Sequence, residues 1–351
     1  MRIAQVAPLF ETVPPRLYGG TERVVATLTD ELVSMGHQVT LFAAAGSHTK
    51  GRLCPTSERA LRLDSTPLKS EVAAHLAMLD EVRRVADRFD VLHFHTELLH
   101  LPMFAEIAEK CVTTLHGRLD IAGLERAYRC WNVHGLVSIS ERQRTPMPRA
   151  NWLATVPHGL AAGEYRESSA AQEYLAFLGR ISPEKAPDVA IRIALKAQVP
   201  LKIAAKVDPV DRAYFETAVR PLLTHPLIEF IGEIGEAEKP GFLTNARALV
   251  FPIRWPEPFG LVMIEAMACG TPVIAMDEGA VPEVIEHGRS GFIVRTEDEV
   301  LEALGALDRL SRRVVRASFE RRFTARRMAH DYVNVYHSLL GSRPSSLMQV
   351  V

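Results

Sequence analysis

Short apolar segments and amphipathic helical segments alternate along almost the whole chain. The apolar runs, most of which end in a glycine or a polar loop, predict buried strands at 2–7, 39–44, 90–95, 111–115, 135–140, 174–178, 201–205, 228–231, 249–251, 273–275 and 292–294. Strands that alternate with helices are typical of parallel sheets covered by helices. The pattern therefore predicts an α/β fold.

A polar segment rich in alanine and serine, 161–173, interrupts this alternation, which then restarts. The chain has 351 residues, which is enough for two α/β domains. We expect an N-terminal domain over 1–162, a C-terminal domain over 163–325 with a helix at 210–223, and a last long helix near 325–340.

The composition limits the class of function. The formal net charge is −1, so the chain lacks the basic field that nucleic-acid binding needs. The apolar run at 2–7 is too short for a signal peptide, and no run of about 18 apolar residues predicts a membrane span. The four cysteines are widely spaced, which indicates neither a zinc site nor a redox motif. We expect a cytoplasmic protein with reduced thiols.

The segment from Trp255 to Ala275 predicts a loop, a short helix, a stop and a strand. Good helix formers fill 261–268. Gly260 allows the backbone to come close to a ligand in front of the helix. Gly270 is placed to end the helix in a left-handed cap, and Pro272 follows just past this end.

Two carboxylates flank the start of this helix. Glu257 and Glu265 are eight residues apart, which on a helix is about 80° around the axis and about 12 Å along it. They are too far apart for one acid–base pair, but they could hold two ends of an elongated ligand. The backbone N–H groups of Phe259, Gly260 and Leu261 lie between them and would attract a phosphate. A nucleotide-sugar fits this pattern; a solvated Glu257 and an exposed Glu265 fit the spacing equally well.

Two further loops carry groups that bind anions. Gly19 and Gly20 follow a strand and a long loop and precede a helix at 22–35 that Thr21 would cap, so they form an anion seat or only close a turn. Arg180 ends a strand, and Lys185 lies in the next turn, where Pro183 would begin a helix. These two cations suit a diphosphate, although surface ion pairs of this kind are common.

Several histidines follow strands of the first half. His116 and Gly117 come directly after the strand at 111–115, so His116 either projects over a ligand or is a hydrogen-bonded structural residue. On the strand at 90–95, alternation places His93 and His95 on the face opposite Leu92 and Phe94, and His100 follows this strand. We interpret them as lining a cleft at the carboxyl ends of the strands, because no carboxylate or cysteine completes a metal-ligand set.

The segment from Glu257 to Glu265 resembles the E-x7-E motif of the retaining glycosyltransferases of family 4, which have the GT-B fold: two Rossmann-like domains that face each other across a cleft. The flanking residues from Trp255 to Ala275 are similar as well. The residues around Arg180 and Lys185 resemble the family's Gly-Arg…Glu-Lys motif, with Ala186 in place of the usual glycine. His158 and Gly159 replace an Asn-Gly pair at the linker.

The resemblance implies a role for each candidate residue. Glu257 would hold sugar hydroxyls, and Glu265 would hold the ribose. The diphosphate would be bound by the side chains of Arg180 and Lys185 and by the backbone N–H groups of Phe259, Gly260 and Leu261. Gly19 and Gly20 would face the donor from the other domain, and His116 would lie beside the reacting carbon. The C-terminal segment 326–345 would pack back on the N-terminal domain.

The expected reaction moves a sugar from a UDP- or GDP-linked donor to an acceptor hydroxyl with retention. No Asp-x-Asp motif occurs in the chain, so we expect neither a metal ion nor a cofactor; the cations and the helix N-terminus would stabilise the leaving diphosphate. A nucleotide-sugar epimerase and a non-catalytic nucleotide-sugar-binding protein are the alternatives. The acceptor would be a glycan, a lipid-linked molecule or a small metabolite, recognised by 8–18, 45–67 and 93–103, and a lipid acceptor would favour peripheral membrane contact.

Overall fold

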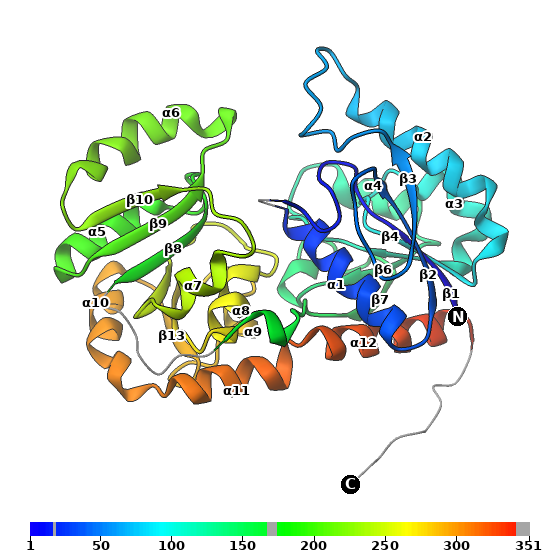
Figure 1. Ribbon diagram of the computed structural model, residues 1–351. Coiled ribbons are helices and arrows are strands. Elements are labelled where there is room, and N and C mark those ends of the chain that lie inside the picture. The colour runs from blue at the N-terminus through cyan, green and yellow to red at the C-terminus, as the bar shows by residue number, and fades with distance from the viewer. Residues whose placement is uncertain (17–18, 167–173, 342–351) are drawn as a thin grey trace, which may run out of the picture. The chain divides into compact units, whose positions relative to one another are not determined.

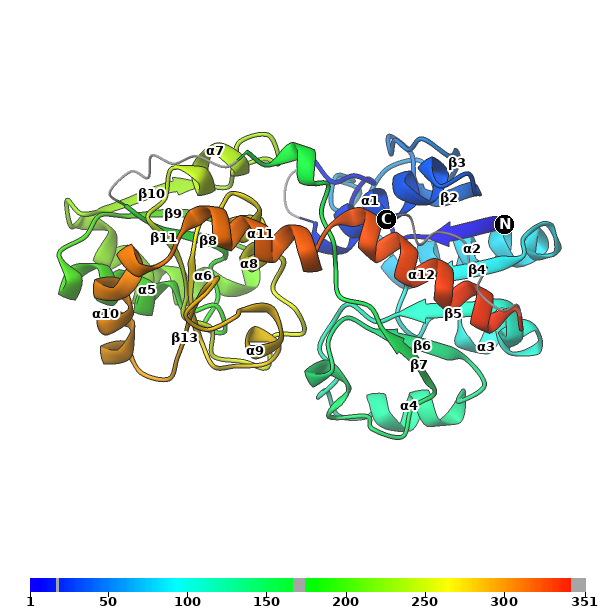
Figure 2. The same ribbon diagram turned by 90° about the horizontal axis from the view of Figure 1, so that it is seen from below.

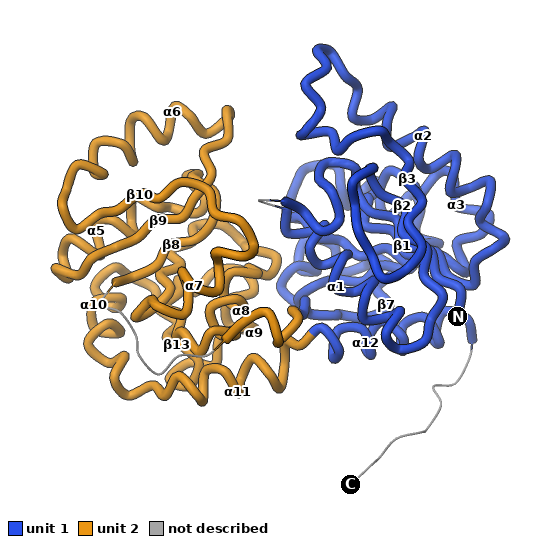
Figure 3. The backbone as a smooth tube through the Cα atoms, in the orientation of Figure 1, with its two compact units in different colours: residues 1–159, 325–351 blue, residues 160–324 orange. Residues whose placement is uncertain are grey.

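A computed structural model describes residues 1–16, 19–166 and 174–341 (Figure 1). The chain divides into two compact units (Figure 3): unit 1 contains 1–159 and 325–351, and unit 2 contains 160–324. Part of the expected linker, 167–173, and the end of the expected C-terminal segment, 342–345, lie outside the described residues. No helix within the described ranges is long and apolar enough to cross a membrane.

Unit 1 is built on a parallel sheet of seven strands in the order β3-β2-β1-β4-β5-β6-β7. The strands are β1 (Arg2–Val6), β2 (Gln38–Ala44), β3 (Arg52–Ser57), β4 (Val91–Phe94), β5 (Cys111–Thr114), β6 (Gly135–Ser138) and β7 (Trp152–Thr155). The segment 45–67, for which the sequence predicted no strand, contains β3. This strand is at the edge of the sheet and is half-exposed, so it lacks the apolar run that marks the buried strands.

Helices cover both faces of this sheet. They are α1 (Gly20–Ser34), α2 (Glu71–Arg84), α3 (Leu101–Phe104), α4 (Leu124–Cys130) and α12 (Ala325–Leu339). Leu92 and Phe94 of β4 pack with α2 in one apolar core, whereas His93 between them faces α12. Helices α1 and α12 pack against each other (Figure 2). Thr21 lies inside α1 and Gly19 is the N-cap residue, so the predicted capping role of Thr21 is wrong.

Unit 2 is built on a parallel sheet of six strands in the order β10-β9-β8-β11-β12-β13. The strands are β8 (Leu175–Arg180), β9 (Leu201–Lys206), β10 (Ile228–Gly232), β11 (Ala248–Phe251), β12 (Val273–Met276) and β13 (Gly291–Val294). The helices are α5 (Pro187–Ala197), α6 (Arg212–Tyr214), α7 (Lys239–Thr244), α8 (Leu261–Ala268), α9 (Val281–Val284), α10 (Glu297–Ala306) and α11 (Arg312–Arg322).

Two helix predictions in unit 2 are wrong in detail. Helix α5 begins at Pro187 and not at Pro183, because Ala186 takes a left-handed conformation (φ 49°) that interrupts the backbone before it. The predicted helix at 210–223 is divided into short turns. Pro221 has no N–H group with which to continue a helical ladder, so a 3₁₀ turn, Arg220–Thr224, ends this segment.

Helix α8 has the predicted bounds, and its end is fixed in two ways. Gly270 is left-handed (φ 70°), its N–H bonds to the Met267 carbonyl at 2.9 Å, and the Thr271 N–H bonds to the Ala266 carbonyl at 2.9 Å. This confirms the predicted glycine cap. Helix α11 packs against α8 (Figure 2), and its Arg312 and Arg316 donate to the Cys269 and Ala268 carbonyls at the α8 C-terminus. The N-terminus of α8 therefore belongs to a helix that is buried from Met263 to Ala268 and held at its C-terminal end.

Candidate active site

The predicted anion-binding groups of unit 2 follow strands β8 and β11. Arg180 is the last residue of β8, Lys185 lies in the following turn, and the loop 252–260 leads from β11 into α8. Strands β8 and β11 are parallel neighbours, so their carboxyl ends share one edge of the sheet. Ligands of α/β folds bind at such an edge.

Lys185 and Glu257 are in direct contact. The Lys185 ammonium forms an ion pair with Glu257 Oε2, and the Trp255 Nε1–H donates to the same oxygen at 3.0 Å. The side chains of Lys185 and Glu257 are only 17% and 11% exposed. The Lys185 Nζ also lies 5.4 Å from the ring centroids of Phe251 and Trp255, which adds cation–π attraction. Sequence reasoning assigned this lysine and this acid to opposite parts of a ligand and did not anticipate their pairing.

Arg180 lies between two acids. Its guanidinium is 3.3 Å from Asp211 Oδ2 and 3.6 Å from Glu184 Oε2. Burial raises the pKa of Asp211, although Arg180 acts against this shift. The Arg180 Nε and Asp211 Oδ2 atoms are buried, and neither makes a hydrogen bond within the described residues. Their contact is thus an ion pair without hydrogen-bond alignment, and Arg180 keeps donors for an anionic ligand.

The start of α8 presents backbone N–H groups. Gly260 is the N-cap residue in a left-handed conformation (φ 81°), and a Cβ there would lie 2.7 Å from the Met263 Cε atom. Within the described chain, the N–H groups of Gly260 and Leu261 donate to no acceptor, as expected for the first turn of a helix. Phe259 is buried with its ring 5.9 Å from that of Phe323, so it can offer only its backbone.

Glu265 is buried in α8, which contradicts the alternative of an exposed helical residue. Its carboxylate is 3.3 Å from the Lys239 ammonium, and that ammonium is 2.5 Å from Glu236. The Glu265 side chain is 3% exposed. Sequence reasoning missed Lys239, which lies at the start of α7 and has no distinguishing motif around it.

Gly279 holds the backbone of Glu257 in place. The Ala280 N–H donates to the Glu257 carbonyl at 2.9 Å. A Cβ on Gly279, whose φ is +51°, would lie 2.3 Å from both the backbone nitrogen and the carbonyl oxygen of Glu257. The close approach and the positive φ both require glycine here. This residue was also missed, because only the folded chain brings β12 beside the loop before α8.

In unit 1, the predicted Gly19-Gly20 pair begins α1. A Cβ on Gly19 would lie 2.6 Å from the Pro15 Cβ atom and 3.2 Å from Glu22 Oε2. The packing of this turn therefore requires a glycine at position 19, independently of any ligand. Burial raises the pKa of the neighbouring Glu22 carboxyl. The predicted anion seat thus contains an acid that burial makes harder to ionise.

His116 lies in a turn that two side chains fix. The Glu97 carboxylate accepts from the N–H groups of His116 (3.1 Å) and Gly117 (3.2 Å). The Gln143 Nε2 donates to the carbonyls of Leu115 (2.9 Å) and Gly117 (2.8 Å). The carbonyl between them, that of His116, accepts no hydrogen bond from the described residues. Sequence reasoning missed Glu97 and Gln143, which come from other loops.

The sequence led us to expect that His93 and His95 line a cleft, but the structure shows that they do not. Both are buried on the face of β4 that α12 covers, and their ring centroids are 4.1 Å apart. His100 stacks on Phe94 at 3.9 Å and pairs with Thr113 Oγ1 at 2.8 Å, so it is structural. In the described part of the chain, no group of three or more histidines, cysteines or acids could hold a metal ion.

Burial keeps this set of histidines neutral. It lowers the pKa of His116 to about 3 and holds the pKa values of His93, His95, His100 and His158 well below the usual value. Below about pH 6.5 the unfolded chain therefore binds protons that folded unit 1 excludes.

We expect acid to destabilise unit 1 before unit 2. The neutral histidines contribute their full stabilisation above about pH 6.5. As the pH falls toward the folded pKa of a histidine, its contribution to the free energy of unfolding decreases by about 1.4 kcal/mol per pH unit. The histidines of unit 2 are His225 and His287, and both are exposed, so their protonation changes little on unfolding. Urea unfolding between about pH 6.5 and 5 measures this, with Trp131 and Trp152 fluorescence for unit 1 and Trp255 for unit 2. Equal losses in both units would contradict the expectation.

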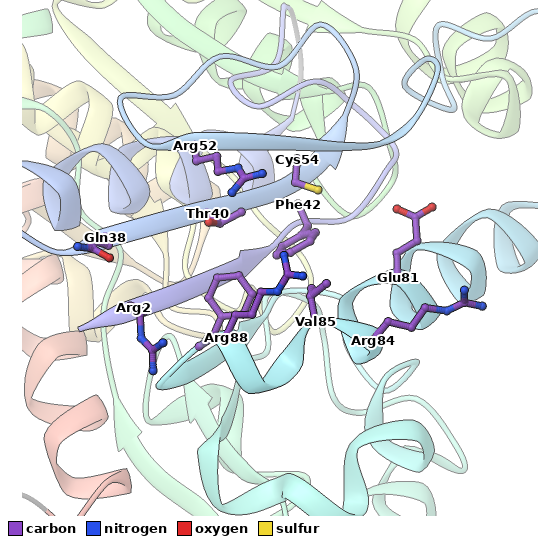
Figure 4. A pocket seen from close by; sticks show the side chains of 11 residues that line it. Arg2, Gln38, Thr40, Phe42, Arg52, Cys54, Glu81, Arg84, Val85 and Arg88 are labelled. Carbon is purple, nitrogen blue, oxygen red and sulfur yellow. The ribbon is translucent and has the colours of Figure 1, made fainter.

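A separate cavity of about 460 Å³ lies at the opposite edge of the unit 1 sheet (Figure 4). Arg2, Gln38 and Arg52, at the amino ends of β1, β2 and β3, line it together with Phe42 and Phe89. His116 follows the carboxyl end of β5. The cavity is therefore not part of the His116 site.

Two family models match the chain, one in each unit. The model described as "Glycosyl transferases group 1" matches residues 164–312, and the model described as "Glycosyltransferase Family 4" matches residues 18–157. The first match contains Arg180, Lys185, Glu257 and Glu265. The second contains His116.

Relatives of known function are similar over different lengths. The chain is 34% identical over 238 residues to D-inositol 3-phosphate glycosyltransferase of Nocardia farcinica, which covers 62% of this chain and 51% of the relative. This chain thus matches about half the length of that relative. It is 28% identical to phosphatidyl-myo-inositol mannosyltransferase of Mycobacterium leprae, with 97% of this chain and 98% of the relative covered.

Solved structures share the fold along nearly the whole chain. Sucrose-phosphate synthase from Thermosynechococcus elongatus has a TM-score of 0.79 at 18% identity, covering 97% of this chain and 99% of that one. Anabaena HepE in complex with UDP-glucose has a TM-score of 0.73 at 19% identity, covering 96% and 100%. At such low identity these similarities concern the fold alone.

Proposed function

Because the chain belongs to glycosyltransferase family 4 and has the GT-B fold, we propose that it transfers a sugar from a UDP- or GDP-linked donor to an acceptor hydroxyl with retention of configuration. Unit 2 would bind the donor, and unit 1 would supply the acceptor side. The observation that supports this most directly is the Lys185–Glu257 ion pair, which joins the turn after β8 to the loop before α8.

In this proposal, the diphosphate is bound by Arg180, Lys185 and the N–H groups of Phe259, Gly260 and Leu261. Without a donor, Lys185 neutralises Glu257. A diphosphate would draw the ammonium away, because its charge exceeds that of one carboxylate. Donor binding would thereby release the Glu257 carboxylate to hold sugar hydroxyls.

Glu265 would hold the ribose hydroxyls while Lys239 compensates its charge. Gly19 and Gly20 of unit 1 would face the donor phosphate and sugar. His116 would lie beside the reacting carbon, with its carbonyl toward the acceptor hydroxyl.

The chemistry of retention follows from this assignment. The bond between the anomeric carbon and the phosphate oxygen breaks, and the acceptor oxygen bonds to the same face of that carbon. The acceptor's proton passes to the departing phosphate, so Glu257 is not a nucleophile. The cations and the α8 N–H groups stabilise the charge on the leaving diphosphate. These groups can carry that charge without a metal ion.

The decisive experiment has three arms. Thermal-shift screening of UDP-, GDP- and ADP-sugars identifies the donor, since a ligand that binds only the folded state raises its stability. Nucleotide release is then measured with and without acceptors, beginning with inositol phosphate and phosphatidylinositol because relatives act on inositol-containing molecules. A chelator is added in the third arm. Donor turnover without an acceptor would indicate an epimerase, and donor binding without any turnover would indicate a non-catalytic protein.

We expect Glu265→Gln to raise KM for the donor about tenfold with little change in kcat. The substitution weakens charge-assisted hydrogen bonds to the ribose, which does not react, so ground-state and transition-state binding fall together. Steady-state kinetics measure this. Glu302→Gln, on the exposed part of α10, is the matched control. A fall in kcat at unchanged KM would contradict the ribose assignment.

A further inference from the structure

We infer that Gln5 and His95 are positioning residues that fix the tautomer and the ring plane of His116, with its Nδ1 atom unprotonated. The inference deepens the proposed function and rests on the role given there to His116. It depends on a chain of hydrogen bonds that runs inside unit 1 from α12 to the turn after β5.

The first links determine which nitrogens carry protons. His95 Nε2 is 2.8 Å from the Gln5 Oε1 atom. A carbonyl oxygen can only accept, so His95 Nε2 carries the proton and His95 Nδ1, in the neutral ring, is an acceptor. His95 Nδ1 is 2.8 Å from His116 Nε2, which must therefore be the donor. The remaining nitrogen of His116, Nδ1, then carries a lone pair and no proton.

The Gln5 amide is held from the other side. Its Nε2 donates to the Tyr336 hydroxyl at 3.1 Å and lies 3.3 Å from His93 Nδ1. The Tyr336 hydroxyl is also 2.8 Å from His93 Nδ1, and His93 Nε2 is 2.8 Å from Thr114 Oγ1. Gln5, His93 and Tyr336 are fully buried, so water does not compete for these bonds. The α12 hydroxyl thus orients the amide that orients His95.

The opposite orientation of the Gln5 amide would reverse each tautomer. His116 Nδ1 would then carry a proton. This atom is buried and has no hydrogen-bond partner within the described residues. A buried N–H without an acceptor is less tolerated than an unfilled lone pair, so the orientation with an unprotonated Nδ1 is favoured.

The chain orients His116 but does not conduct protons. Burial keeps His93, His95 and His116 neutral near pH 7. Gln5 interrupts the path, because an amide passes a proton only by becoming an imidic acid. The His116 ring is also stacked on His158, with centroids 5.3 Å apart and planes at 16°, so its plane is fixed as well as its tautomer.

Gln5→Met tests the inference, since it removes the acceptor of the His95 proton at similar volume. Histidine ¹⁵N chemical shifts distinguish a bare ring nitrogen from an N–H. In the unchanged protein we expect a bare Nδ1 on both His95 and His116. In Gln5→Met we expect mixed tautomers of His95 and His116. Because a misoriented His116 would meet the donor less well, we also expect a donor KM raised about fivefold, an effect the size of one neutral hydrogen bond, with kcat less affected.

Two substitutions on α12 make the test specific. Tyr336→Phe removes the hydroxyl that holds Gln5 and should mix the tautomers even if Gln5→Met does not fold. Tyr332→Phe is the matched comparison, because its hydroxyl contacts Thr114 and reaches Gln5 only indirectly, through Thr114 and His93. It should leave the His116 shifts and the donor KM unchanged.

A protonated Nδ1 on His116 in the unchanged protein would overturn the inference, as would unaltered His116 shifts in both Gln5→Met and Tyr336→Phe. The shifts are read without substrate. If the unchanged protein transfers no sugar, the proposed function fails, while the tautomer result still decides the assignment of Gln5 and His95.

Discussion

Replacing both Arg180 and Lys185 by alanine is expected to lower kcat/KM by about 10³-fold or more. Loss of one preorganised group that stabilises developing negative charge costs roughly 10²–10³ in rate, and here two cations are removed from the position assigned to the diphosphate. Lys185 also neutralises Glu257, so the double variant leaves a buried carboxylate with only the Trp255 N–H as its partner among the contacts described above.

The matched control for this variant is Arg220→Ala with Lys196→Ala. It removes the same charge from unit 2, but from exposed side chains that pair with Glu216 and Glu297. Its kcat/KM should change little, because exposed ion pairs contribute at most about 1 kcal/mol. Steady-state kinetics and a melting curve of each variant separate catalysis from folding. If the double variant transferred sugar normally, the phosphate assignment would be wrong.

Gly279→Ala is expected to lower the free energy of unfolding by about 2–5 kcal/mol and the transfer rate by about 10²-fold. The new methyl group would collide with the Glu257 backbone, in addition to the cost of a positive φ. If the Glu257 loop moves to make room, its carboxylate leaves the position assigned to the sugar, and a displacement of about 1 Å can cost 10²-fold in rate.

Gly288→Ala separates the two causes. Gly288 also has a positive φ (73°), but a Cβ there would have no neighbour within 4 Å. It should cost about 1 kcal/mol from backbone strain and leave the transfer rate unchanged. Urea unfolding and initial rates of both variants measure the difference. Equal rates for the two variants would show that Gly279 does not position Glu257.

Local features of this chain could be predicted from the sequence, and contacts between distant segments could not. The bounds of α8 and its Gly270 cap depend on neighbouring residues, so the motif alone determines them. The Lys185–Glu257 and Lys239–Glu265 pairs join residues 72 and 26 positions apart, and no pattern within either segment indicates its partner. The edge strand β3 was missed for a different reason: half-exposed strands lose the apolar run by which buried strands are recognised.

For His93 and His95, the sequence predicts the correct face of the sheet but not what surrounds the side chains there. Alternation along β4 places His93 and His95 opposite Leu92 and Phe94, as expected. That face is covered by α12, whose Tyr332 and Tyr336 come from the far end of the chain. Sequence alternation determines a side of the sheet, but it does not reveal what covers that side.

Helix α12 also sets the order in which the protein can be completed during synthesis. Unit 2 is one continuous stretch, 160–324, whereas unit 1 needs its first 159 residues and a helix that begins at Ala325. Until that helix has left the ribosome, Gln5 and His93 lack the tyrosine hydroxyl that satisfies them. Unit 1, whose first 159 residues are synthesised before unit 2, can therefore complete its fold only after unit 2 has been synthesised.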